Sequence, residues 1–202
     1  MIGSVFIVAA PSGTGKTSLV KELLARDPAI TESVSYTTRN ARRGELNDRD
    51  YHFVDQDTFS KMVSDGEFLE CAEVHGNMYG TRQKRIDDQR AEGTDIVLEI
   101  DWQGAQQVRK KLPDVICIFV LPPSVGVLRD RLTGRAQDSA SIIERRLGAA
   151  RMEVAHVHEF DYVIINDVFD EAVEDLVSIV RSTRLRLEAQ LGRNKTLINS
   201  LK

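Results

Sequence analysis

The apolar run Val5-Phe-Ile-Val-Ala9 leads directly into Ala10-Pro-Ser-Gly-Thr-Gly-Lys-Thr17. A short apolar run followed by a glycine-rich turn and Lys-Thr predicts a buried strand whose end carries a phosphate-binding loop. Apolar residues at Leu19, Val20 and Leu23 predict a helix that begins at Thr17 and directs its positive end toward the bound anion. The stretch therefore predicts a nucleoside triphosphate site at one edge of a parallel sheet.

Each residue type in this loop suits phosphate binding. Glycine at positions 13 and 15 lets the backbone approach phosphate oxygens, Lys16 supplies a cation for the terminal phosphates, and Thr17 offers a hydroxyl to Mg²⁺. Ala10 stands where the strict motif has glycine, so the turn must accept a β-carbon there. The alternative is a glycine-rich turn without a ligand. The residues predicted to bind ATP in this loop are Ala10, Pro11, Ser12, Gly13, Thr14, Gly15, Lys16, Thr17 and Ser18.

Length and composition limit what the protein can be. The chain has 202 residues with 42% hydrophobic content, which suits one α/β core with small insertions. A net charge of -4 argues against broad binding to nucleic acid or to an anionic membrane. Since the chain shows neither a secretory leader nor a membrane-spanning apolar stretch, we expect a cytoplasmic protein. Cys71 and Cys117 are expected to be buried, reduced thiols.

Apolar strands alternate with amphipathic helices along the chain, which predicts a parallel sheet with helical crossovers. The expected strands are Val5–Ala9, Asp95–Ile100, Val115–Leu121 and Tyr162–Ile165, with a further strand near Ser33–Thr37. The expected helices are Thr17–Ala25, Arg82–Ala91, Gln103–Lys111, Val125–Leu132, Ser141 to about His158, and Glu171–Leu191. We expect Ser141 to cap its helix in a capping box, and Asp170 and Gly192 to bound the last helix.

Two polar stretches interrupt this alternation. Residues 36–80 combine turn and strand patterns with one short helix near Asp57–Val63, and residues 129–140 are polar around Gly134. Insertions of this kind in a regular α/β chain usually carry function. The first holds Arg39, Arg42 and a third arginine in one loop, and arginine forks fit phosphate oxygens bidentately.

Several motifs together resemble the guanylate kinase family over nearly the whole chain. The quoted runs are A-P-S-G-T-G-K-T, S-V-S-Y-T-T-R-N-A-R-R-G-E, D-Y-H-F-V, F-L-E-C-A-E-V-H-G-N-M-Y-G-T, L-E-I-D-W-Q-G-A-Q-Q, F-V-L-P-P-S, G-R-A-Q-D-S and I-I-N-D. The resemblance implies an α/β P-loop nucleoside monophosphate kinase, with a parallel sheet flanked by helices and inserted GMP-binding and lid regions. It implies one domain over residues 1–202, with core segments 1–34, 82–128 and 159–202, a GMP-binding region 35–81, and a lid with its following helix at 129–158.

The resemblance also implies roles for individual residues. Contacts to the acceptor phosphate fall on Arg39, Arg42, Tyr51 and Tyr79, and contacts to guanine on Ser35, Glu70 and Thr81. Lid arginines fall on Arg131, Arg135 and Arg146, and an adenine-side contact on Asn166. The chemistry agrees, because guanine presents N1–H and an exocyclic amine side by side, and the Glu70 carboxylate can accept both.

Two acidic residues, Glu99 and Asp101, stand at the end of one predicted strand. At Glu99 the family leads us to expect aspartate, and glutamate is one methylene longer, which puts its assigned contact with GMP in doubt. Asp101 either assists Mg²⁺ through water or caps the helix near Gln103. Trp102 is most simply a packing residue.

Transfer from ATP to GMP needs no side-chain base, since the acceptor phosphate is already anionic. We therefore expect catalysis by positioning and charge neutralisation from Lys16, Arg39, Arg135 and Arg146 with Mg²⁺. Arg146 could instead belong to a solvated helix face. Two rival functions are a related kinase for another phosphorylated acceptor, such as a ribose phosphate, and a binding module of the same fold that docks phosphopeptides. Oligomeric state is not predicted.

Overall fold

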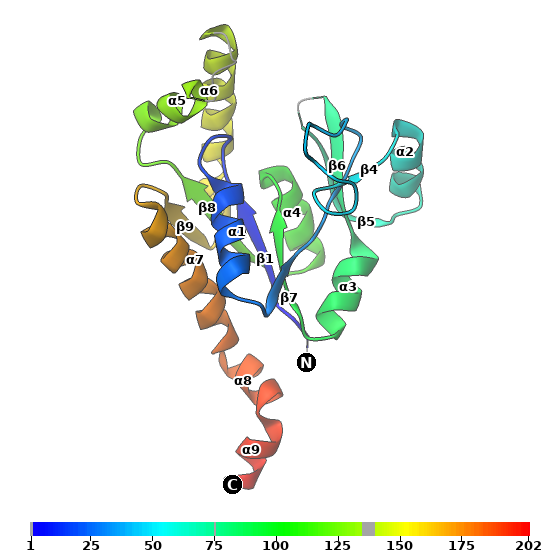
Figure 1. Ribbon diagram of the computed structural model, residues 1–202. Coiled ribbons are helices and arrows are strands. Elements are labelled where there is room, and N and C mark those ends of the chain that lie inside the picture. Colours follow the sequence, from blue (N-terminus) through cyan, green and yellow to red (C-terminus); the bar gives the residue numbers. More distant parts are fainter. Residues whose placement is uncertain (1, 75, 135–139) are drawn as a thin grey trace.

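Five parallel strands form the central sheet of the computed structural model, which describes residues 2–74, 76–134 and 140–202. The strand order β2-β7-β1-β8-β9 places β1 in the middle, so the loop after β1 leaves from the centre of the sheet (Figure 1). The predicted parallel α/β sheet is confirmed. Its strands are β1 (Val5–Ala9), β2 (Ile30–Glu32), β7 (Asp95–Glu99), β8 (Ile116–Leu121) and β9 (Tyr162–Ile165).

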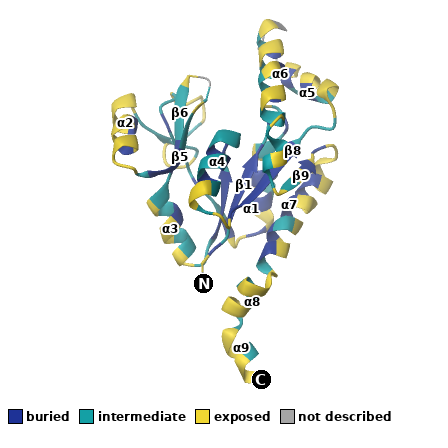
Figure 2. Ribbon diagram, turned by 180° about the vertical axis from the view of Figure 1, so that it is seen from behind, coloured by how far each residue is buried: buried dark blue, intermediate teal, exposed yellow. Residues whose placement is uncertain are grey.

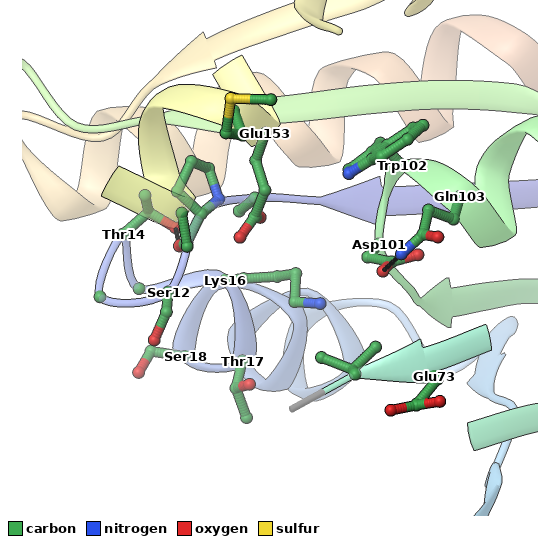
Figure 3. Close-up of a pocket in the computed structure, with 17 residues that line it drawn as sticks. Ser12, Thr14, Lys16, Thr17, Ser18, Glu73, Asp101, Trp102, Gln103 and Glu153 are labelled. Atoms are coloured by element: carbon green, nitrogen blue, oxygen red, sulfur yellow. Dashed lines mark hydrogen bonds between the residues drawn. The ribbon is translucent and has the colours of Figure 1, made fainter. Parts of the chain in front are cut away.

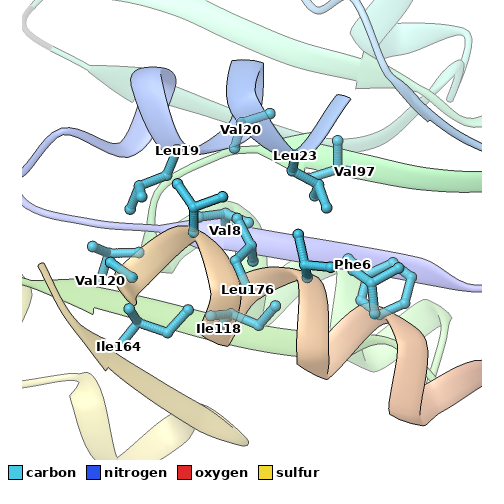
Figure 4. Packing of buried hydrophobic residues seen from close by; sticks show 14 of the residues in the cluster. Phe6, Val8, Leu19, Val20, Leu23, Val97, Ile118, Val120, Ile164 and Leu176 are labelled. Atoms are coloured by element: carbon cyan, nitrogen blue, oxygen red, sulfur yellow. The ribbon is translucent and has the colours of Figure 1, made fainter. Parts of the chain in front are cut away.

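Helices cover both faces of this sheet because its strands are apolar on both sides. Phe6 and Val8 of β1 pack with α1 (Lys16–Arg26) and α7 (Phe169–Arg184) in one cluster, which includes Leu176 (Figure 4). The alternate residues Val5 and Ile7 face α3 (Gln83–Ala91) and α4 (Trp102–Lys111) in a second cluster. Figure 2 shows the strands β1 and β8 buried between these layers.

A second, smaller sheet stands beside the first. Its order is β4-β3-β6-β5, and it is antiparallel except between β3 and β4. Phe59, Met62 and Phe68 form its own core beneath α2, whose N-cap Asp55 accepts a hydrogen bond from Thr58 N at 2.7 Å. The elements are β3 (Tyr36–Thr37), β4 (His52–Phe53), α2 (Gln56–Ser64), β5 (Phe68–Val74) and β6 (Asn77–Arg82).

The helices α5 (Val125–Thr133) and α6 (Ala140–Val154) project together beyond the carboxyl end of the central sheet (Figure 1). Leu128 and Leu132 of α5 pack against Ile143 and Leu147 of α6 in a separate apolar cluster. A short 3₁₀ helix, Val157–Glu159, then leads into β9. This pair therefore forms a small packed unit above the loop that follows β1.

The strand predicted near Ser33–Thr37 is divided between the two sheets. The nearby strand of the central sheet is the edge strand β2, which begins three residues earlier, and Tyr36 and Thr37 belong to the small sheet. Ser33 N still donates to Val97 O at 3.1 Å, after which the chain turns away. The turn occurs because Thr37 is fully buried in the small sheet, where its hydroxyl donates to Met78 O. Alternation along the sequence could not reveal which sheet the residues would join.

Three predicted helix boundaries are wrong. Helix α6 already includes Ala140, so Ser141 lies inside it and does not cap it, and α6 ends at Val154 before the 3₁₀ helix. Helix α7 starts at Phe169, which places Asp170 in its first turn.

The predicted helix to Leu191 breaks after α7. Two short helices follow, α8 (Leu187–Arg193), which contains Gly192, and α9 (Lys195–Ser200). Beyond the sheet the apolar face has nothing to pack on, and Leu185 and Leu187 are 70% and 72% exposed. Both short helices extend away from the body (Figure 2). In the part of the chain that the structure describes, no helix has the length and apolarity needed to cross a bilayer.

A buried ion network joins α7 to the start of the sheet. Arg184 Nη1 donates to Asp27 Oδ2 at 2.5 Å, and its Nε donates to Asp95 Oδ2 at 2.6 Å. The other carboxylate oxygen of Asp95 accepts from Ser4 N at 2.7 Å, and the Asp95 side chain is 2% exposed. The network ties the last turn of α7 to β1 and β7.

Replacing Arg184 by alanine should lower the free energy of unfolding by about 3 to 5 kcal/mol, because buried Asp27 loses the cation that binds it and buried Asp95 keeps only Arg193, 3.9 Å away. Urea denaturation followed by circular dichroism measures the change. Asp175→Ala, at an exposed position on the same helix, should change it by less than about 0.5 kcal/mol. Equal unfolding midpoints for the two variants would contradict this account of the network.

Candidate active site

The loop after β1 adopts a conformation that requires glycine at two positions. Gly13 and Gly15 have φ of 95° and 94°, in the left-handed region. A β-carbon at Gly15 would also lie 2.6 Å from Asn166 Nδ2. Ala10 does not have a positive φ, and its methyl group packs against the first core cluster. Alanine is therefore accommodated where the strict motif has glycine.

Two residues brace this loop from the side of β9 and α5. Asn166 is buried, and its Nδ2 donates to Thr14 O at 2.6 Å. Arg131 Nη2 donates to Asn166 O at 3.0 Å, and its Nη1 lies 3.4 Å from Thr14 O. Both were predicted to contact ATP. In the structure their polar atoms hold the backbone of the loop at Thr14.

A pocket of about 580 Å³ opens above the loop (Figure 3). The side chain of Lys16 extends into it from the first turn of α1 and makes no hydrogen bond or ion pair with a described residue. Arg146, about two turns before the end of α6, donates from Nη2 to Ser12 Oγ at 2.7 Å. The lining residues are the loop from Ala10 to Ser18, Glu73, Val74, Asp101, Trp102, Gln103, Ala149, Met152 and Glu153.

A second pocket, of about 250 Å³, lies between the two sheets and joins the first at Lys16, Val74 and Asp101. The structure brings most of the residues predicted for GMP to its wall. They are Ser35, Arg39, Arg42, Tyr51, Glu70, Tyr79 and Glu99. Thr81 is not on the wall, since it is fully buried behind Glu70. Arg135, the remaining predicted catalytic residue, lies outside the described residues.

Arg39 is held in place by an acid and two aromatic rings. Its Nη2 donates to Glu45 Oε1 at 3.0 Å, and its guanidinium carbon lies 5.3 Å from the centroid of the Tyr51 ring. The same guanidinium carbon lies 5.8 Å from the centroid of the Phe53 ring, and the Tyr79 ring centroid is 5.9 Å from that of Tyr51. The other oxygen of Glu45 accepts from Arg42 N at 2.7 Å. The two arginines are thus positioned on one side of the second pocket.

Glu70 also lines this pocket and is almost fully buried. Its residue is 3% exposed, and its Oε1 accepts from Thr81 Oγ1 at 2.6 Å. Burial, together with the negative charge of Asp101, raises the pKa of the Glu70 carboxyl to about 7, although the hydrogen bond from Thr81 opposes the rise. The second oxygen lies against Gly104, where a β-carbon would be 2.8 Å away.

Glu99 and Asp101 lie where the two pockets meet. Glu99 Oε2 accepts from Thr17 Oγ1 at 2.9 Å, so glutamate reaches the loop from the end of β7. Asp101 is the N-cap of α4, with Oδ1 accepting from Gly104 N at 2.9 Å. It also lines both pockets. The capping role is present, and it leaves the carboxylate at the pocket wall.

Sequence reasoning missed Glu45, Gly104 and Glu153. Glu45 and Gly104 contact predicted residues but belong to no sequence motif. A glycine in the first turn of a predicted helix, as at Gly104, is only a weak sign of close packing. Trp102 was interpreted as a packing residue. It stacks on His156 with ring centroids 3.6 Å apart, and it also lines the first pocket. Of the two cysteines, Cys117 is buried and Cys71 is only half-buried.

The phosphate-binding loop at the centre of a parallel sheet, with an adjoining pocket of arginines, tyrosines and a buried acid, defines a P-loop nucleoside monophosphate kinase. The family model for guanylate kinase matches residues 3–183. The chain belongs to the guanylate kinase family, whose members are ATP:GMP phosphotransferases.

Individual relatives agree over the full length. The chain is 58% identical to a guanylate kinase of Thiobacillus denitrificans, over 99% of this chain and 96% of the relative. It is 54% identical to a guanylate kinase of Dechloromonas aromatica, with all of both chains covered. The crystal structure of guanylate kinase from Anaplasma phagocytophilum superposes with a TM-score of 0.77 at 34% identity, covering 92% of this chain and 88% of that one. The similarity therefore includes both pockets.

Replacing Gly104 by alanine should weaken GMP binding by about 10-fold or more, because the new methyl group displaces the Glu70 carboxylate. Calorimetric titration with GMP measures the loss. Gly148→Ala is the matched control, since that helical glycine has open space around its β-carbon position and should keep the affinity of the parent protein. A Gly104→Ala protein with unchanged affinity would show that the position of Glu70 does not matter for GMP.

Proposed function

We propose that the protein transfers the γ-phosphoryl group of ATP, bound with Mg²⁺, to GMP by in-line displacement, giving ADP and GDP. The observation that carries the proposal is that Lys16 lines two adjoining pockets. One pocket has a phosphate-binding loop, and the other combines arginines with a buried carboxylate. A donor triphosphate and an acceptor monophosphate can therefore meet at one lysine.

Recognition of the acceptor base falls to Glu70 and Ser35. An ionised Glu70 accepts hydrogen bonds from N1–H and the exocyclic amine of guanine, while the Ser35 hydroxyl reaches O6. Adenine has an unprotonated N1, which would face the carboxylate acceptor to acceptor. Thr81 acts through Glu70, because its hydroxyl already donates to that carboxylate. This division of roles supports guanine specificity without a direct contact from Thr81.

The acceptor phosphate is assigned to Arg39, Arg42, Tyr51 and Tyr79. The hydrogen bond of Arg39 to Glu45 and its packing on Tyr51 keep its guanidinium ordered before the phosphate arrives. A preorganised arginine loses little side-chain entropy on binding, and its fork fits phosphate oxygens in pairs. Glu99 is assigned to the same pocket, where it also contacts Thr17.

The donor nucleotide is assigned to the loop from Ala10 to Ser18, with Arg131 and Asn166 supporting it from behind. The oxygen donors near Lys16 suit Mg²⁺, which prefers hard oxygen ligands and keeps several waters. The Thr17 hydroxyl would hold it directly, and Asp101 would hold it through water. When bound, Mg²⁺ neutralises charge on the β and γ phosphates.

Catalysis then requires no general base. Lys16, Arg39 and Arg146 offset the repulsion between two anions, which amounts to about 4 kcal/mol for one pair of unit charges 4 Å apart at an effective dielectric of 20. Arg146 would move from Ser12 to the transferred group as the lid closes, and Arg135 is proposed to act beside it. The lid and its following helix (129–158) and the GMP-binding region (35–81) would close over the core segments 1–34, 82–128 and 159–202 to exclude water.

The two rival functions fit the site less well. A sugar phosphate needs no acid matched to guanine, and a phosphopeptide-binding module has no use for a loop that holds ATP. We also propose a cytoplasmic location, where both nucleotides are available.

A coupled assay of ADP release tests the proposed function. Turnover should require GMP, with AMP, ribose 5-phosphate and buffer giving little ADP. Lys16→Ala should lower kcat by about 100-fold or more, because the charge shared by both substrates is lost. Equal ADP release with and without GMP would exclude the transfer reaction.

The affinity for GMP should depend on pH through Glu70. With a pKa of about 7 in the free protein, the carboxyl is mostly neutral at pH 6 and mostly ionised at pH 8. Only the ionised form accepts both guanine donors, so the dissociation constant should be about 10-fold larger at pH 6 than at pH 8. Calorimetry at both pH values measures this.

Glu70→Gln provides the control for this pH dependence. The amide does not titrate, so the variant should bind GMP weakly at both pH values, and what pH dependence remains belongs to the GMP phosphate and other groups. A wild-type protein with the same pH dependence as Glu70→Gln would contradict the role given to Glu70.

A further inference from the structure

One half-buried carboxyl group in the first pocket has no role in the proposed function. Glu153 lies near the end of α6, and Figure 3 shows its carboxyl group pointing into the pocket toward the loop and Lys16. It is half-buried, and it makes no hydrogen bond or ion pair with a residue that the structure describes. A half-buried acid without a partner costs stability, so a structural role does not explain it.

The charges of Asp101 and Lys16 act on the carboxyl group of Glu153. Burial and the negative charge of Asp101 together raise the pKa of Glu153 to about 7, although the positive charge of Lys16 opposes the rise. Asp101 itself reaches the pocket from the end of β7. The pocket that receives a triphosphate therefore presents two negative groups close to its lysine.

Glu153 lies closer than Arg146 to the end of α6 that is anchored to the core. The two residues are seven apart and so lie on the same helix face, both toward the loop. The chain that follows Glu153 is anchored to α4. His156 stacks on Trp102, and Glu159 accepts from Gln106 Nε2 at 2.7 Å. Glu153 therefore stays near Asp101, while Arg146 is farther from the anchored end.

We propose that Glu153, together with Asp101, makes the donor pocket select ATP bound to Mg²⁺ over metal-free ATP. Metal-free ATP carries about four negative charges at pH 8, and both carboxylates repel it. Mg²⁺ halves that charge, and the waters that it keeps can donate hydrogen bonds to a nearby carboxylate. Glu153 is thus a specificity-determining residue that disfavours binding of metal-free ATP. The inference rests on the proposed ATP site.

The test compares binding of two forms of ATP by calorimetry at pH 8, without GMP. One titration contains ATP with EDTA, and the other contains ATP with excess Mg²⁺. The ratio of the two dissociation constants measures the selection for the metal complex. In Glu153→Gln this ratio should fall by about 10-fold, because metal-free ATP binds more tightly and the magnesium complex gains nothing. Glu153→Ala should show the same fall, so the result does not depend on one variant folding.

Glu73→Gln is the matched control, since Glu73 lines the same pocket but is exposed, where solvent screens its charge. A fall confined to the two Glu153 variants supports the inference. An unchanged ratio in those variants, or an equal fall in Glu73→Gln, overturns it. The ADP-release assay of the wild-type protein separates the two proposals. A wild-type protein that fails to phosphorylate GMP would refute the proposed function. A wild-type protein that phosphorylates GMP, with an unchanged ratio of dissociation constants in the Glu153 variants, would refute only the role of Glu153.

Discussion

Repulsion between two phosphate groups is the constraint on which this structure depends. A donor and an acceptor that are both anionic must approach within bonding distance, and the protein meets the cost with fixed positive charge. Lys16 stands where the two pockets join, Arg39 is held ready by Glu45 and Tyr51, and Arg146 reaches the loop from α6. Each cation comes from a different part of the fold, so the site exists only when the parts assemble.

The acidic groups of the site also have defined positions at the pocket walls. Glu70 is buried where guanine would donate two hydrogen bonds, and Gly104 leaves room for its second oxygen. Asp101 caps α4 and still faces both pockets. Glu153 adds a charge beside the triphosphate position that favours the neutralised form of the donor. The proposed specificity for base and for metal thus follows from acids that are held at the walls of the two pockets.

The sequence predicted the α/β class and most residues of the two pockets, because these depend on local patterns and on ordered motifs. Its errors concern elements whose limits are set by distant neighbours. The strand near Ser33–Thr37 was divided because Thr37 is buried in another sheet. The last helix broke after Arg184 because the apolar residues beyond it, such as Leu187, have no surface to pack on. Alternation and helical spacing carry no information about either neighbour.

By itself, the sequence determined the phosphate-binding loop, since two glycines, a lysine and a threonine after an apolar strand suffice to define that backbone. It also determined the family, through motifs in a fixed order. Tertiary structure alone decided that Asn166 and Arg131 brace the loop and that Thr81 acts behind Glu70. It alone placed the carboxyl group of Glu153 in the first pocket, away from any ion-pair partner among the residues that the structure describes. The physical reason is that hydrogen bonds and burial between residues far apart in the chain arise only when the folded elements pack together.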